Sequence, residues 1–171
     1  LFVVSEDSAS GGLGGDFLSS RVQHKTSDLT LGHRLTYVER SALDREATVQ
    51  VADMIWRKSE NMEMRGQILH SDISQLANPI NAQTRVDSQD FASWVNWSYA
   101  PNDSWYHILY LSHYGDDFDM NDMGYMQRND FREFFGSTSY DRTDFPDSSS
   151  FLSSSTVLEY GSTETTAGDR L

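Results

Sequence analysis

The sequence predicts an all-β chain, an antiparallel up-and-down meander of about eight to nine strands that forms one segment of a transmembrane β-barrel. Three observations predict this fold class. Several segments alternate apolar and polar residues with a period of two, and long connections alternate with short ones along the chain. Eight Tyr, nine Phe and four Trp also stand among many Ser, Thr and Asn, a composition that favours pleated, half-exposed strands over helices.

The clearest alternation lies in the segment 62–68, where apolar or small residues occupy the even positions and Glu63, Arg65 and Gln67 the odd ones. Segments near 29–37 and 152–160 have the same pattern, and we expect further strands at 1–5, 17–25, 47–57, 91–99, 104–114 and 131–141. Because side chains alternate between the two faces of a strand, the apolar set should face lipid and the polar set the barrel interior. The residues expected outside are Leu29, Leu31, Leu35, Tyr37, Met62, Met64 and Ile68, and those expected inside are Arg34, Glu63, Arg65 and Gln67.

The expected connections alternate in length without exception. Long ones are expected at 6–16, 39–46, 71–90 and 115–130, and shorter ones at 26–28, 58–61, 100–103 and 142–149. Outer-membrane barrels place long extracellular loops opposite short periplasmic turns, which explains such an alternation. A fragment of a soluble β-sandwich or propeller, with loops of chance length, is the alternative that these residues leave open.

Composition excludes several other classes of protein. Thirteen Lys and Arg against 26 Asp and Glu give a net charge of -13, which repels nucleic acid and anionic membrane surfaces and favours cations. The absence of Cys excludes disulfides, thiolate catalysis and Cys-ligated metals. Since no apolar run approaches the roughly 20 residues of a transmembrane helix, a helical membrane protein is excluded as well. The chain opens at Leu1 without an initiator Met or a signal peptide, so we expect residues 1–171 to be part of one barrel from a longer chain.

Two stretches resemble a known family. They are 35–45, which reads LTYVERSALDR, and Gly115-Asp116-Asp117-Phe118 followed by 123–132, which reads MGYMQRNDFR. Both are similar to the barrel of a bacterial outer-membrane family of unknown function, whose full-length members carry an N-terminal module like the family-nine carbohydrate-binding domains. The resemblance covers nearly the whole chain and implies an outer-membrane barrel. It supplies no catalytic or ligand-binding residues, and carbohydrate enters as a partner by the resemblance alone.

One expected loop gathers oxygen ligands of the kind that calcium selects. Because the spacing differs from that of an EF-hand loop, a solvated acidic loop is favoured over a dedicated calcium site, and both interpretations stay open. The candidate ligands are Asp116, Asp117, Asp119, Asn121 and Asp122.

Other chemistry has little support in the sequence. The five His are scattered over different strands without the spacing of a metal site, and the glycine-rich segment 11–15 lacks the Lys of a phosphate loop. No set of nucleophile, base and orienting group converges, so we expect no enzyme active site. The aromatic residues near the short turns are typical of a girdle at the lipid headgroups, and they are Trp56, Trp94, Trp97, Tyr99, Trp105 and Tyr106.

The sequence therefore favours an uncharacterised membrane protein of the Gram-negative outer membrane that acts in solute passage or surface binding. Its expected partners are outer-membrane lipid and, at an acidic rim built from the long loops, divalent cations; nucleic acid is not expected. No cofactor is expected with certainty, and calcium is the one candidate ion. The alternative function is that of a secreted or surface-attached β-rich module that binds carbohydrate or calcium.

Overall fold

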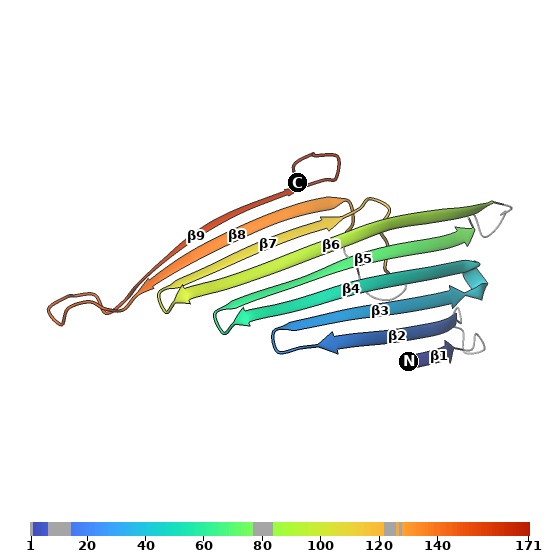
Figure 1. Ribbon diagram of the computed structural model, residues 1–171. Helices are drawn as coiled ribbons and strands as arrows, with labels where there is room; N and C mark the ends of the chain where they lie inside the picture. The colour runs from blue at the N-terminus through green and yellow to red at the C-terminus, as the bar shows by residue number, and fades with distance from the viewer. Residues whose placement is uncertain (1, 7–14, 77–83, 122–125, 127) are drawn as a thin grey trace.

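The computed structural model describes residues 2–6, 15–76, 84–121, 126 and 128–171, and it contains one antiparallel sheet of nine strands (Figure 1). The strands lie side by side in the order of the chain, each paired with the next. They are β1 (Phe2–Glu6), β2 (Gly15–Lys25), β3 (Leu29–Arg40), β4 (Arg45–Ser59), β5 (Met62–Leu76), β6 (Arg85–Asn102), β7 (Trp105–Tyr114), β8 (Phe131–Arg142) and β9 (Ser154–Glu164), with a 3₁₀ turn, η2 (Ser41–Leu43), between β3 and β4.

The prediction of an all-β antiparallel meander is confirmed. The sheet is open, because among the described strands β1 pairs only with β2 and β9 only with β8. Closure into a barrel is therefore not a feature of this structure. Among the described residues, no helix has the length and apolar character needed to cross a membrane.

The two faces of the sheet differ in chemistry. Residues directly opposite each other on paired strands share a face, and one such row runs from Leu31 through Met54, Gly66, Val95 and Leu111 to Phe134. We call this side the apolar face, and exposed side chains such as Ile68 (62%) lie on it. The register confirms that the seven residues expected outside share this face: Leu29, Leu31, Leu35, Tyr37, Met62, Met64 and Ile68.

We call the opposite side the charged face, and it carries two kinds of residue. Toward the short turns it presents charged and amide side chains, among them Arg34, Glu63, Arg65 and Gln67, as the alternation predicts. Toward the other end it carries small and apolar residues, of which Leu69 and Ala92 pack against a loop. With one exception, Phe118 of that loop, the buried hydrophobic residues of the described chain all belong to this face, and they are Val38, Ala47, Val49, Leu69, Ile73 and Ala92.

The connections differ in part from the expected lengths. Residues 39–46 were expected to form a long loop, but β3 and β4 extend through this region and leave only the 3₁₀ turn and Asp44, which has a positive φ of 45°. The expected loop 71–90 is mostly strand as well, because β5 and β6 stay paired from Ser71↔Asp90 to Leu76↔Arg85. Backbone hydrogen bonds hold a ladder together whatever the polarity of its side chains, so the hairpin continues through polar residues.

At the other end of the sheet, one connection is longer than expected. Residues 143–153 join β8 to β9 and extend well beyond the neighbouring hairpins (Figure 1). The connections still alternate in length along the chain, and 26–28, 60–61 and 103–104 are as tight as predicted. The two ends of the sheet are less distinct than expected, because 143–153 at the short-turn end is longer than 41–44 at the opposite end. The expected loop 6–16 reduces to residues 7–14, which lie outside the described residues.

Four of the six residues expected in an aromatic girdle share one face of the sheet, and their contact with lipid headgroups stays a prediction. Trp56, Trp97, Tyr99 and Trp105 lie on the apolar face near the short turns, where the Trp105 ring contacts Tyr140 with 4.7 Å between centroids. Trp94 and Tyr106 lie instead on the charged face, opposite Gln67 and Ser139 respectively. An odd spacing, as between positions 94 and 97, places two residues on opposite faces of a strand.

Candidate functional site

The described residues of the β7–β8 connection, 115–121, 126 and 128–130, fold back over the charged face, and we call them the docked loop. Its base is closed by backbone hydrogen bonds, since the Asp130 N–H donates to the Gly115 carbonyl over 3.1 Å and the Gly115 N–H donates to the Phe91 carbonyl over 3.1 Å. Asp130 has a positive φ of 54°, a conformation that Asp tolerates better than most residues.

Phe118 anchors the loop to the sheet. Its side chain is 0% exposed and packs against Leu69 of β5 and Ala92 of β6, with Val51 and Trp94 at the edge of the same cluster. A buried Phe side chain contributes roughly 1.5–3 kcal/mol through the hydrophobic effect. The apolar patch on an otherwise polar side of the sheet therefore has a partner within the chain.

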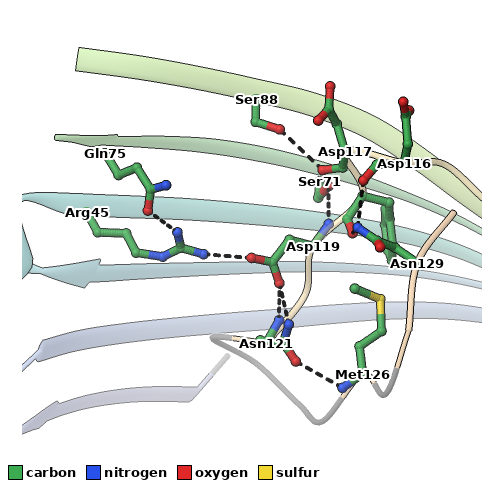
Figure 2. Close-up of polar contacts among 11 residues, drawn as sticks. Arg45, Ser71, Gln75, Ser88, Asp116, Asp117, Asp119, Asn121, Met126 and Asn129 are labelled. Carbon is green, nitrogen blue, oxygen red and sulfur yellow. Dashed lines mark hydrogen bonds and ion pairs between the residues drawn. The ribbon is translucent and has the colours of Figure 1, made fainter. Parts of the chain in front are cut away.

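Hydrogen bonds from β5 and β6 hold the backbone of the docked loop. The Asp117 N–H donates to the Asp90 carboxylate over 3.1 Å, and the Ser88 hydroxyl donates to the Asp117 carbonyl over 3.2 Å (Figure 2). The Asp119 N–H donates to the Ser71 hydroxyl over 3.2 Å. Asp117 is thus bonded to β6 and Asp119 to β5, which is the neighbouring strand.

Gly115 leaves space for the contact between the Asp90 carboxylate and the Asp117 N–H. A Cβ at this position would overlap the carboxylate of Asp90, the same group that accepts from the Asp117 N–H. Because Gly115 has no side chain, the Asp90 carboxylate can pass it and reach the Asp117 N–H.

A polar network ties the far part of the loop to β4 and β5. The Asp119 carboxylate lies 3.0 Å from the guanidinium of Arg45, which also donates to the Gln75 side chain (Figure 2). The second Asp119 oxygen accepts two hydrogen bonds from Asn121, each 2.8 Å. Within the loop, the Asn129 amide donates to the carbonyls of Asp116 over 2.6 Å and Phe118 over 3.2 Å.

The carboxylates of the described calcium candidates do not point toward a common centre. The Asp116 and Asp117 side chains point away from the Asp119 carboxylate, which faces Arg45 and Asn121 (Figure 2). Asp122 lies outside the described residues. Within the described part of the chain, no group of three or more His, Cys, Asp or Glu is arranged to hold a metal ion. Calcium binding here stays a prediction.

The C-terminal segment fixes the end of the docked loop. The Asp130 carboxylate accepts hydrogen bonds from the Thr166 N–H over 3.0 Å and from the Thr166 hydroxyl. These hydrogen bonds hold the pKa of Asp130 below its ordinary value of 3.8, because they stabilise the ionised form.

Ion pairs cross the strands on the charged face nearer the short turns. Arg21 of β2 reaches over β3 to the Asp53 carboxylate of β4, at 3.1 Å, and the carboxylate lies where a Cβ on Gly32 would stand. On β5, Glu63 pairs with both Arg57 and Arg65. This half of the face therefore carries two groups of paired opposite charges.

The described acids of the expected long loops lie at one end of the sheet, as predicted, but many of them belong to strands. Glu39 and Glu46 are directly opposite each other on β3 and β4. Arg85 offsets part of this charge, since its guanidinium lies 2.9 Å from Glu46 and 3.5 Å from Asp44.

Sequence reasoning missed the residues that dock the loop. Ser71, Ser88, Asp90 and Arg45 are far from the loop in sequence, and no local pattern marks them as its partners. The one available signal was Phe118, an aromatic residue in a run of acids. A comparison of the chain with protein-family models and with curated proteins finds no match, so the family resemblance remains a prediction.

Proposed function

We propose that the chain is a section of the wall of an outer-membrane β-barrel in a Gram-negative bacterium. The apolar face contacts lipid, the charged face lines a water-filled interior, and the barrel acts in solute passage or surface binding. The observation that carries this proposal is the distribution of charge between the two faces.

Five consecutive strands contain segments of the length that crosses an outer membrane, about 9–11 residues. These segments are 29–37, 48–56, 62–70, 91–99 and 105–113. Their apolar-face positions contain no Asp, Glu, Lys or Arg, whereas their charged-face positions include Arg34, Asp53, Glu63 and Arg65. Lipid tolerates no such charges at mid-height, and a water-filled interior does.

Two further features support a lipid environment. The rings of Trp97, Tyr99, Trp105 and Tyr140 gather on the apolar face near the short turns, where a barrel meets the headgroups. A hollow of about 960 Å³ between large side chains such as Leu31, Met54 and Phe134 opens on the same face. Its lining is mainly apolar, which suits acyl chains, and also contains the ion pair of Arg132 with Glu164.

The open edges agree with a barrel of more than nine strands. An exposed strand edge invites pairing, and β9 carries Val157 and Leu158 (72% exposed) on its two faces beside such an edge. Further strands would pair with β1 and β9 and remove both edges. Barrels of about 16 strands enclose an aqueous channel, which fits a role in passage.

A pair of matched substitutions on β5 tests the proposal. Ile68→Arg places a charge on the apolar face and should destabilise the assembled full-length protein in lipid by about 2–4 kcal/mol. Gln67→Arg places the same charge one residue away on the charged face and should cost only about 1 kcal/mol, through the lost hydrogen bond from the Trp94 indole N–H. Urea unfolding in lipid vesicles and retention of the protein in the outer-membrane fraction measure both variants.

The same pair separates the barrel from a secreted binding module. In water, Arg at the exposed position 68 would cost nothing, so both variants of a secreted module would stay soluble and Ile68→Arg would be at least as stable as Gln67→Arg. An Ile68→Arg variant at least as stable as Gln67→Arg, with a wild-type protein that needs no detergent, would therefore contradict the proposal.

A further inference from the structure

The docked loop adds a second layer to part of the charged face. It leaves β7, and its contacts reach β6 through Asp90, β5 through Ser71 and β4 through Arg45. With neighbouring strands about 4.8 Å apart, the loop covers roughly 14 Å of the sheet across the strands. A packed layer of chain stands about 10 Å above a sheet, so the loop projects substantially from the wall.

The Phe118 contacts also fix the position of the docked loop along the length of the strands. Phe118 packs on Leu69 and Ala92, which belong to the membrane-length segments 62–70 and 91–99. The loop therefore lies at the upper end of these segments, with Phe118 just inside that end and the contacts to Ser71 and Asp90 just beyond it. A hollow of about 710 Å³ remains beside it, lined by residues that include Tyr114, Phe131 and Arg128.

The contacts hold the described part of the loop against the wall at its base, its middle and its far part. Gly115 and Asp130 close the base, Phe118 fills the apolar patch, and Asp119 pairs with Arg45. The Phe118 and Asp119 contacts span large separations in sequence, so the folded sheet sets the position of the loop beyond its base.

We propose that the docked loop is a fixed constriction that sets the upper size limit of solutes passing along the charged face. This inference rests on the proposed function, since only a barrel gives the charged face an enclosed interior. Releasing the loop should widen the passage for uncharged solutes, because the effect depends on the space that the loop occupies.

Liposome swelling by the full-length protein tests the constriction, with neutral oligosaccharides of increasing length as the probes. Phe118→Ala removes the apolar anchor, and Asn129→Ala is a milder second variant that removes two hydrogen bonds within the loop. Phe151→Ala is the matched control, because Phe151 is exposed in the β8–β9 connection at the other end of the sheet. Limited proteolysis reports whether the loop is released, and heat-dependent gel mobility reports whether the barrel is folded.

We expect both loop variants to admit the longer oligosaccharides several-fold faster than the wild type, with no change in the control. If the loop becomes protease-sensitive while the dependence of swelling on solute length stays that of the wild type, the constriction is overturned and passage itself stands. If neither the wild type nor any folded variant supports swelling, the proposed role in passage fails, and the constriction fails with it.

Discussion

Phe118→Ala should release the docked loop while leaving the sheet intact. The Phe118 side chain is 0% exposed between the loop and the sheet. Replacing a buried Phe with Ala costs about 3–5 kcal/mol in a rigid core, but the loop can relax into the space, so we expect about 2–3 kcal/mol. At about 1.4 kcal/mol for each factor of ten, the open population of the loop should rise roughly 30- to 140-fold.

Hydrogen exchange of the loop backbone, followed by mass spectrometry, measures this opening. The amides of Asp117 and Asp119 donate to Asp90 and Ser71 in the closed state, so their exchange reports on docking. The β5 and β6 amides of the Ser71–Asp90 ladder serve as the internal control and should keep their protection. Unchanged loop protection would refute the anchoring role of Phe118, and lost protection throughout β5 and β6 would show that Phe118 stabilises the sheet itself.

The remaining predictions concern single contacts. Gly115→Ala should displace the Asp90 carboxylate and raise proteolysis of the docked loop, and proteolysis at the wild-type rate would show that Asp90 can move without loss. Arg21→Gln should lower the free energy of unfolding in urea by less than about 1 kcal/mol, because the Arg21 guanidinium that pairs with Asp53 is exposed to solvent. A larger loss of stability would show that this ion pair is stronger than an exposed pair. The lowered pKa of Asp130 contributes stability above the ordinary value of 3.8 that is lost as the pH falls through the lowered pKa. Pepsin should therefore cleave the Asp130→Asn variant faster than the wild type at a pH above 3.8, and both at the same rate at a pH below the lowered pKa. A difference in cleavage rate that persists at the lowest pH would contradict the role of the ionised Asp130 carboxylate.

The strands were predictable because their signal is local. In 62–68, the alternation of Met and Ile with Glu, Arg and Gln places each set on the expected face, and the register confirms it. A period of two needs no knowledge of the partner strand, since the pleat alone determines which side chains share a face.

The strand ends were less predictable because apolar alternation fades before backbone pairing does. Ser71, Asp72, Asp87 and Gln89 gave no strand pattern, yet they pair in the β5–β6 ladder. Polar side chains can occupy both faces of a hairpin where both faces are in contact with water. The sequence therefore marks the apolar band more reliably than the ladder.

The docked loop could not be predicted because its contacts are long-range. Asp119 reaches Arg45 and Ser71, and neither residue carries a local sign of that contact. The acids of 115–122 were interpreted as a solvated loop or a calcium site, whereas the described ones serve partly as backbone and ion-pair anchors. Only the fold of the sheet brings these residues together.

The central claim is that the apolar face of the sheet contacts lipid. Single spin labels placed in turn at residues 62–70 of the full-length protein in lipid vesicles test it, with oxygen as the lipid-soluble relaxant and a nickel chelate as the water-soluble one. The account predicts that labels at Met62, Met64 and Ile68 respond to oxygen, and that labels at Glu63, Arg65 and Gln67 respond to nickel. A strong nickel response at the three apolar-face positions would contradict the account, because it would place that face in water.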